Sequence, residues 1–395
     1  MTAVPVSASE PFRRRLHLIL FLTAIFFFNF LARFIWGPLL PAIEKDLGIL
    51  HAASGSLFLM MSFGYGIGLF MSGVFSSRIT HKWTVVLSSL AVSLALAAAT
   101  LAPSLLMLRL ILITVGASAG LYLPSAIASL TWRLEPRHWG KAFSFHEVSP
   151  SLGFVVGPLL VEALLADCSW RGVLWPVAGA MLVMGLAYAV GPGTGEYRGE
   201  APNLKNVRFV LTQKTFWIML GLYVLMVGMN VGVYSMLPLY LQSVRGFSQT
   251  MTNSVLAASR VAAMFTPFLA GWANDRYGPA PVLAIIISTC GLATALIGLV
   301  PGHWVWVMIF LQSILSVAFF PPGFAILAGI VPPSQRNLIV ALLMPVAMLL
   351  GSGAMPTLIG VFGDSGRFAH GFILFGLLTT FSTLLLWFLK TARPE

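Results

Sequence analysis

The sequence predicts an all-α integral membrane protein with twelve transmembrane helices, arranged as two pseudo-symmetric bundles of six. Three observations support this prediction: a composition that soluble domains do not have, twelve long apolar segments, and an internal repeat that divides the chain near its middle. The segments and their short connections account for nearly the whole chain, so no soluble catalytic domain is expected.

Charged residues are scarce in this chain of 395 residues. Only 9% of the residues are charged and 58% are hydrophobic, and the mean hydropathy is +0.91. About a quarter of the residues of a soluble domain are charged, so this chain needs a lipid environment. A net charge of +11 would suggest nucleic acid as the partner of a soluble protein, but here the positions of the charges explain it.

Twelve apolar segments are long enough to cross a hydrocarbon layer about 30 Å thick, which takes roughly 20 helical residues. They are expected at residues 16–40, 54–75, 83–102, 104–130, 142–165, 170–190, 215–241, 251–272, 279–300, 303–330, 337–361 and 368–389. The first follows three arginines, as in a signal peptide, but its apolar run is too long and lacks a small-residue cleavage site. We therefore expect it to remain as the first helix. Pro124 and the pair Pro321 and Pro322 allow helix breaks in segments four and ten.

The basic residues are distributed unevenly between the two sides of the predicted membrane. With both termini inside, sixteen of the 23 lysines and arginines fall in cytoplasmic loops and termini. The outer loops hold Lys45, Arg171, Arg245 and Arg367, and the membrane segments hold Arg33, Arg109 and Arg260. Because cytoplasmic loops retain Lys and Arg, the chain is expected to be an N-in, C-in, multi-pass protein of a bacterial cytoplasmic (inner) membrane, with no nucleic-acid partner.

The two halves of the chain resemble each other at a constant offset. Segment 73–78, GVFSSR, recurs 198 residues later as segment 271–276, GWANDR, and Pro158 recurs at the same offset as Pro356. The predicted division is a first bundle at residues 1–190, a cytoplasmic linker at 191–214 and a second bundle at 215–395. Paired repeats of this kind suit transport by alternating access, with a substrate site near the midplane between them.

The repeated loop resembles a motif of the major facilitator superfamily. "GWANDRYG" matches the family's Gly-x-x-x-Asp-Arg-x-Gly loop, and "GVFSSRITHK" is its first-half copy, with Ser77 where the acid usually stands. The resemblance covers essentially the whole chain and implies a cytoplasmic gate formed by Gly73, Arg78, Gly271, Asp275 and Arg276. Charges at these helix ends would pair across the bundles or with helix termini, and the gate is expected to be weaker at Ser77. As an alternative, the arginines serve only as topology anchors.

A second motif, "GFVVGP", resembles the family's segment-five Gly-x-x-x-Gly-Pro element. It contains Gly153, Gly157 and Pro158. Small residues let membrane helices approach closely, so these three are expected to serve helix packing.

Two arginines, Arg33 and Arg260, lie far from the ends of their segments. A charge at this depth costs at least ~2.5–3.5 kcal/mol and normally faces a cavity or a partner. Of the 12 acidic residues, only Glu147 and Glu162 fall within the segments, so a cavity containing both arginines would be electropositive when empty. Guanidinium suits bidentate binding of carboxylate, phosphate or sulfonate, and the expected partner is an anionic substrate. The alternative is that one arginine binds helix carbonyls or Glu147; for Arg109, a structural role is expected.

The position of Arg33, eight residues before Pro41, resembles the organic-anion and organophosphate branch of the superfamily. The resemblance implies that this arginine holds the anionic group of the substrate. Phosphate-ester exchangers of that branch have a second arginine at the point where this chain has Asn230, eight residues before Pro238. This departure favours a less charged, carboxylate-type anion, as in the related monocarboxylate carriers, with Arg260 in the second role.

Five further polar residues at membrane depth are expected to line the substrate site: Asn230, Tyr234, Tyr122, Gln312 and Tyr65. Convergent hydrogen-bonding groups of this kind are typical of small-ligand sites. Each of them could instead bond a neighbouring helix.

His146 and Glu147, near the start of the fifth segment, are the candidates for proton coupling. Histidine titrates near neutral pH, and a buried carboxyl can hold a proton. The alternatives are an interfacial histidine in water and a carboxylate that neutralises an arginine.

The leading functional interpretation is a secondary active transporter for a small organic anion, working as a proton-coupled symporter and as a monomer. The alternative is a proton-driven exporter of hydrophobic or cationic compounds, which would need buried carboxylates in segment one or four; neither segment has one. A membrane-embedded enzyme is disfavoured, because the sequence has no P-loop, nucleophile elbow or His/Cys cluster. No cofactor is expected.

Overall fold

The computed structural model describes residues 12–131, 134, 136–191, 195–199, 207–330 and 336–389, and these residues form helices and no strands. The helices of the first half are α1 (Phe12–Phe34), α2 (Trp36–Leu47), α3 (His51–Ile79), α4 (His81–Thr100), α5 (Leu105–Gly120), α6 (Tyr122–Thr131), α7 (Pro136–His146), α8 (Val148–Leu165) and α9 (Trp170–Val190). The helices of the second half, which include two π-helical segments (η2, η4) and one 3-10 segment (η5), are α10 (Val207–Thr212), α11 (Lys214–Val227), η2 (Gly228–Val233), α12 (Tyr234–Ser243), α13 (Gln249–Ala263), α14 (Thr266–Tyr277), α15 (Pro279–Leu299), α16 (Trp304–Ala318), α17 (Phe320–Ile330), α18 (Arg336–Ala347), η4 (Met348–Ala354), α19 (Met355–Asp364), α20 (Phe368–Ser382) and η5 (Thr383–Phe388).

Within the described residues, these helices combine into twelve spans that are long and apolar enough to cross a membrane, which confirms the predicted number. The main difference is at the ends of the spans. The first runs from Leu16 to Leu47, beyond the predicted end at residue 40. The added turns carry Glu44, Lys45 and Asp46, which a hydropathy pattern assigns to a loop but which remain helical because α2 packs against its neighbours.

Five spans are interrupted at the same distance from a proline. The preceding helix ends four residues before the proline, as shown by the pairs Phe34 and Pro38, Gly120 and Pro124, His146 and Pro150, Ala263 and Pro267, and Ala318 and Pro322. Proline lacks an N–H, and its ring clashes with the carbonyl four residues earlier, so the helical ladder stops at that residue. The breaks expected in segments four and ten are confirmed. Two functional candidates, Arg33 and His146, lie in the last helical turn before such a break.

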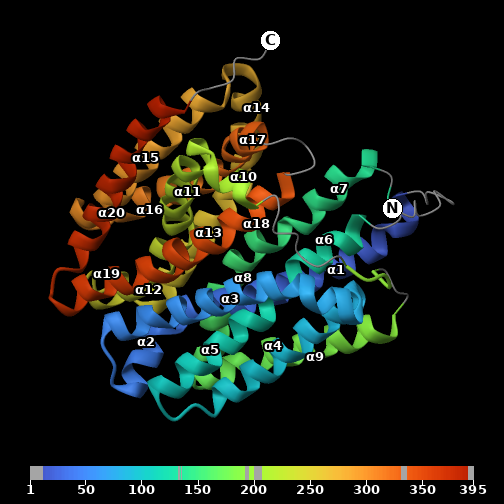
Figure 1. Ribbon diagram of the computed structural model, residues 1–395. Coiled ribbons are helices and arrows are strands. Elements are labelled where there is room, and N and C mark those ends of the chain that lie inside the picture. The colour runs from blue at the N-terminus through green and yellow to red at the C-terminus, as the bar shows by residue number, and fades with distance from the viewer. Residues whose placement is uncertain are drawn as a thin grey trace.

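The helices form two bundles side by side, one from the blue-to-green part of the chain and one from the yellow-to-red part (Figure 1). One end of the molecule, here called the near end, carries α7, α14 and α17 (Figure 1). The opposite, far end carries α2 and α19 (Figure 1). Contacts between the bundles join α2 to α12, α8 to α13, and α3 to η4 and α19.

The halves touch most closely toward the far end. A Cβ on Gly360 of α19 would overlap the carbonyl oxygen of His51, and a Cβ on Gly55 of α3 would lie 2.6 Å from the carbonyl oxygen of Pro356. Only glycine permits backbones to approach this closely. No comparable packing joins α6 or α7 to α14 or α17 within the described residues. As far as the described ranges extend, the two bundles are therefore closed against each other at the far end and not at the near end.

A short piece of the predicted linker, Gly195–Gly199, lies against the near end of the first bundle. Its backbone accepts hydrogen bonds from the amides of His81 (3.2 Å, Tyr197 O) and Lys82 (2.8 Å, Gly195 O). The Tyr197 hydroxyl donates to the Ala128 carbonyl at 2.9 Å, and burial raises the pKa of Tyr197 to about 12. Residues 192–194 and 200–206 of the predicted linker lie outside the described residues, and the boundaries of the domain division stay a prediction.

Candidate functional site

Arg33 lies between the two bundles, beside a small cavity. Its side chain is 4% exposed, and its guanidinium carbon lies 4.2 Å from the centre of the Tyr65 ring, 5.1 Å from that of Phe34 and 5.4 Å from that of Phe30. Its Nε is buried and has no hydrogen-bond partner. A buried guanidinium surrounded by rings keeps cation–π attraction but is left short of hydrogen-bond acceptors.

The cavity beside Arg33 has a volume of about 10 Å³, which is room for about one water molecule. Both bundles line it, with Arg33, Phe34, Phe58, Met61, Ser62, Tyr65, Met348 and Ser352. No acidic side chain belongs to this lining. The hydroxyls of Ser62 and Ser352 meet across the bundles at 3.0 Å. The cavity lining therefore combines one cationic side chain, a few hydroxyl groups and several apolar side chains.

Arg260 is also buried, at 2% exposure, but its polar environment differs from that of Arg33. Its Nη1 donates to the side-chain oxygen of Asn230 at 2.5 Å, and its Nη2 donates to the backbone carbonyl of the same residue. The guanidinium lies between the rings of Phe154 and Tyr234, 4.0 Å from the centre of each. Only Nε is buried without a partner. In this conformation the protein itself supplies most of the partners of Arg260.

The π-helical segment η2 makes this arrangement possible. A π-turn shifts the hydrogen-bond pattern of the helix, and two carbonyls of η2 accept from side chains instead. Asn230 O accepts from Arg260, and Met229 O accepts from Gln312 Nε2 at 2.7 Å. Of the residues predicted to line the substrate site, Asn230 and Gln312 thus make contacts within the second bundle.

Phe154 lies between the two arginines. Its ring centre is 4.9 Å from that of Phe30 and 5.4 Å from that of Phe34, which both face Arg33, and Arg260 lies over the ring itself. Its carbonyl accepts a hydrogen bond from the Tyr234 hydroxyl of the other bundle at 3.0 Å. Sequence reasoning did not select Phe154. The sequence feature that could have indicated Phe154 is its position directly after Gly153, whose missing side chain leaves room for the Phe30 ring.

His146 and Tyr122 lie together in the first bundle and not in the lining of the Arg33 cavity. The Tyr122 hydroxyl donates to the Leu22 carbonyl at 2.6 Å, so its oxygen is left to accept from His146 Nε2, 3.1 Å away. This arrangement suits the Nε2–H tautomer of a neutral imidazole. Nδ1 then faces Glu147, 3.7 Å from its Oε1. The histidine is 1% exposed and the glutamate side chain 64% exposed, so the pair connects the interior of the bundle with its surface.

The residues of the predicted cytoplasmic gate lie at the near end. Arg78, Asp275 and Arg276 are exposed, and within the described part of the chain they form no ion pair. Among the residues that the structure describes, Asp275 accepts a hydrogen bond from its neighbour Asn274 alone, at 3.1 Å. Their gating role stays a prediction, because the bundles are not closed at this end.

The packing and structural candidates lie within the first bundle. A Cβ on Gly153 would be 2.6 Å from the Phe30 ring and one on Gly157 would be 3.4 Å from Leu31, so the fifth span lies directly on the first. Pro158 is buried in α8. Arg109 donates from Nε to the Ser56 hydroxyl at 2.9 Å, a contact between spans four and two. The described residues contain no group of three or more His, Cys, Asp or Glu able to hold a metal ion.

Twelve helical spans in two bundles, with a buried cation in a cavity between them, define a multi-pass membrane transport protein and not an enzyme. The family model described as "Major Facilitator Superfamily" matches residues 22–272 and 248–395. The chain belongs to the major facilitator superfamily.

The chain is also similar to individual curated proteins and to solved structures. The chain is 25% identical over 365 residues to a probable 4-methylmuconolactone transporter of Cupriavidus pinatubonensis, covering 86% of this chain and 84% of the relative. It is 20% identical over 302 residues to a gallate transporter of Pseudomonas putida, covering 67% and 66%. A D-xylose–proton symporter has the same fold, with a TM-score of 0.79, 14% identity and coverage of 98% of this chain and 99% of that chain.

Proposed function

We propose that the protein carries a small carboxylate-type organic anion across the membrane by alternating access, with the carboxylate bound to Arg33. The observation that carries the proposal is a buried guanidinium with an unpaired Nε, beside a cavity between the bundles whose lining contains no acid. An anion that reaches Arg33 when this cavity widens during transport supplies the missing acceptors through charge-assisted hydrogen bonds. The aromatic surround of Arg33 suits an apolar or planar body attached to the carboxylate.

The names of the relatives favour a carboxylate as the substrate but do not identify which carboxylate. The names of the two transporters compared above refer to 4-methylmuconolactone and gallate, and gallate is a carboxylate. Two further relatives, from Chlamydia species, are named as probable hexose phosphate transport proteins. A phosphate ester is disfavoured for this chain, because Asn230 occupies the position where phosphate-ester exchangers have a second arginine. The Asn230 side-chain oxygen accepts a hydrogen bond from Arg260 instead.

The orientation and coupling belong to the same proposal. With N-in, C-in topology in a bacterial cytoplasmic membrane, the near end is cytoplasmic and the conformation is inward-facing. A structural neighbour with a TM-score of 0.78 is described as inward-facing and occupied. A proton is taken up at Nδ1 of His146 through the exposed Glu147, and the imidazolium is then stabilised by that carboxylate. The transporter works as a monomer, and the division at residues 191–214 separates its two moving bundles.

The test is binding and transport of a panel of monocarboxylates, dicarboxylates, sulfonates, phosphate esters and lipophilic cations. The panel is applied to the purified protein by thermal shift, and the binders are then tested for uptake into proteoliposomes with an imposed pH gradient. We expect stabilisation by monocarboxylates and uptake driven by an inward proton gradient. Stabilisation by lipophilic cations alone would support the exporter instead and would contradict the proposal.

Replacing His146 by glutamine is expected to uncouple transport from protons without abolishing substrate binding. Glutamine can keep a donor toward the Tyr122 hydroxyl but cannot take up a proton near neutral pH. We expect proton-driven accumulation to fall at least about tenfold, while exchange of substrate across the membrane continues. The measurement compares gradient-driven uptake with substrate exchange in the same proteoliposomes. Equal loss of both activities, or unchanged accumulation, would exclude His146 as the proton site.

A further inference from the structure

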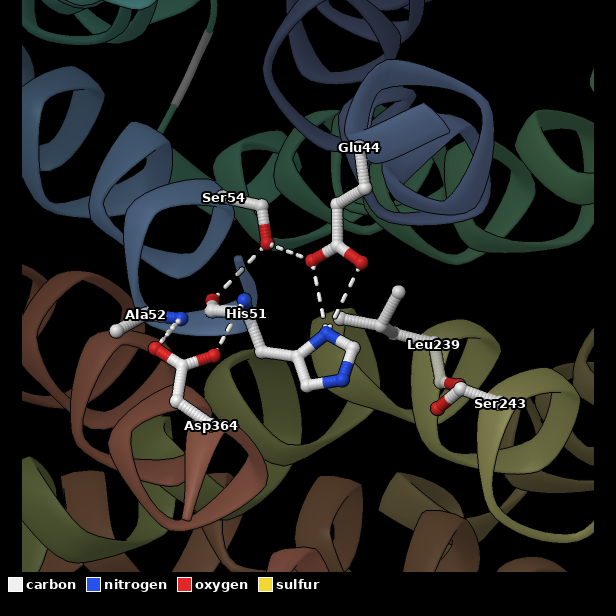
Figure 2. Close-up of polar contacts among 7 residues, drawn as sticks. All are labelled: Glu44, His51, Ala52, Ser54, Leu239, Ser243 and Asp364. Atoms are coloured by element: carbon white, nitrogen blue, oxygen red, sulfur yellow. Dashed lines mark hydrogen bonds and ion pairs between the residues drawn. The ribbon is translucent and has the colours of Figure 1, made fainter. Parts of the chain in front are cut away.

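Two carboxylates at the far end, Glu162 and Asp364, each bind the opposite bundle. Asp364 is the last residue of α19, and it accepts hydrogen bonds from the backbone amides of His51 (2.7 Å) and Ala52 (3.1 Å) at the start of α3 (Figure 2). Glu162, in α8, accepts from three side chains in the first turns of α13: Gln249 at 3.3 Å, Thr250 at 2.6 Å and Asn253 at 3.0 Å. The sequence analysis noted Glu162 only as an acidic residue within a segment, and it selected neither carboxylate as a functional candidate.

The two contacts join corresponding spans of the two halves, and their partners at the starts of α3 and α13 are related by the internal repeat. His51 and Gln249, and likewise Ala52 and Thr250, are 198 residues apart, which is the offset of the repeated loops. Glu162 lies three residues before the end of the fifth span at Leu165, and Asp364 ends the eleventh, the corresponding span of the second half; the two carboxylates are 202 residues apart and so do not occupy the same position of the repeat. Each half therefore places a carboxylate from the end of its fifth span on the start of the second span of the other half. The two contacts are therefore similar in place but differ in detail, because Asp364 binds backbone amides and Glu162 binds side chains.

Asp364 supplies what the start of α3 lacks. The first amides of a helix have no acceptor within the helix, and the residue before α3, Leu50, provides no side-chain cap. A carboxylate at this point also interacts favourably with the helix dipole. Since the acceptor comes from the other bundle, separation of the far ends removes the cap and leaves the amides to water.

Residues of the first bundle also hold the start of α3 in place. Glu44 of α2 contacts His51 Nδ1 at 2.9 Å and accepts from the Ser54 hydroxyl at 2.5 Å, so both interactions remain within the first bundle (Figure 2). Leu239 and Ser243 of α12 face the same region and, with Glu44, line an open hollow at the far end (Figure 2). The start of α3 is thus fixed to α2, and in the described part of the chain its first amides donate to the second bundle at Asp364 alone.

We infer that Glu162 and Asp364 are paired gate residues that hold the far end closed, and that both must release before substrate reaches Arg33 from that side. The inference rests on the alternating-access part of the proposed function and not on the identity of the substrate. Hydrogen bonds to a carboxylate are roughly twice as strong as neutral ones, but these are near the surface and exchange with water. Two such contacts can stabilise one conformation and still open during transport.

The test measures the conformation directly, without substrate. One pair of spin labels is placed at the far end by Leu101→Cys and Leu299→Cys, and a second pair at the near end by Val190→Cys and Trp387→Cys; all four side chains are exposed. The background carries Cys168→Ser and Cys290→Ala to remove the two free cysteines. Distance distributions are then compared for Glu162→Gln, Asp364→Asn and the double variant.

We expect the double variant to raise the ratio of far-open to far-closed molecules about tenfold or more, with longer distances at the far end and shorter ones at the near end. The matched control is Asp46→Asn. Asp46 is also a far-end carboxylate, but it accepts from Trp170 (3.1 Å) and Arg171 of its own bundle, so neutralising it should leave both distributions unchanged.

Unchanged distances in the double variant, or an equal shift in the control, would overturn the inference. Broadening at both ends without the opposite shifts would indicate loss of structure and would also count against a gate. Because no substrate is added, this result does not depend on whether the protein binds an anion. Failure of the anion panel and failure of the gate are therefore distinguishable.

Discussion

Replacing Arg33 by methionine is expected to weaken substrate binding strongly without lowering the thermal stability of the empty protein. The substrate loses charge-assisted hydrogen bonds worth about 1.5–3 kcal/mol each, so the Kd should rise at least roughly 10- to 150-fold. The empty protein loses a buried cation whose Nε has no partner, and methionine keeps sulfur–aromatic contacts with the surrounding rings. The measurement is the thermal midpoint with and without the best anion of the panel.

The matched control for Arg33 is Arg109→Met. Arg109 donates to Ser56 within the first bundle and does not line the cavity, so its replacement should leave the Kd unchanged. Wild-type affinity in the Arg33 variant would remove this residue from the site. A large loss of stability in the empty variant would show that the guanidinium is structural.

Replacing Arg260 by methionine is expected to lower the thermal midpoint of the empty protein, in contrast to the replacement of Arg33. The change removes the Arg260 donor from the Asn230 carbonyl and leaves the Asn230 side-chain oxygen with only the Ser316 hydroxyl, at 3.4 Å; an unsatisfied buried group costs about 1–3 kcal/mol. The guanidinium also leaves the space between Phe154 and Tyr234, which join the two bundles. We expect a destabilisation of about 2–5 kcal/mol, measured as a fall in the thermal midpoint.

A companion variant, Asn230→Asp, separates a structural role of Arg260 from a substrate role. A carboxylate at position 230 would neutralise Arg260 at hydrogen-bond distance, so the midpoint should not fall, whereas an anion that needs a free Arg260 should bind more weakly. If Arg260→Met keeps its stability but loses binding, the structural interpretation of Arg260 is wrong. The sequence-based prediction of a direct substrate contact would then be supported.

Much of the fold follows from short-range rules that a single sequence contains. Apolar length predicted the twelve spans, because the thickness of a bilayer sets the length of a crossing helix. Proline chemistry accounts for the five breaks, because each depends on a proline and the carbonyl four residues before it. Sequence reasoning used this rule in segments four and ten and overlooked it at Pro38, Pro150 and Pro267.

The site was less predictable, because a residue type shows that a partner is needed but not which one. Both buried arginines were found from their depth and charge. Their different environments come from neighbours that are distant in the chain: Arg260 donates to both the side-chain oxygen and the η2 carbonyl of Asn230, 30 residues away. Tyr122 was assigned to the substrate site on polarity alone, whereas the structure places it against His146 and Leu22.

The sequence by itself determined the class of this protein, its twelve spans, its internal repeat and the need of Arg33 for a partner, because hydropathy, proline geometry and the cost of a buried charge act locally along the chain. Only the tertiary structure decided which end of the bundles is closed, which arginine remains short of acceptors, and that Glu162 and Asp364 each hold the opposite half. Those features depend on contacts between residues as far apart as His51 and Asp364, which are separated by 313 positions. No local pattern encodes a pairing at that distance.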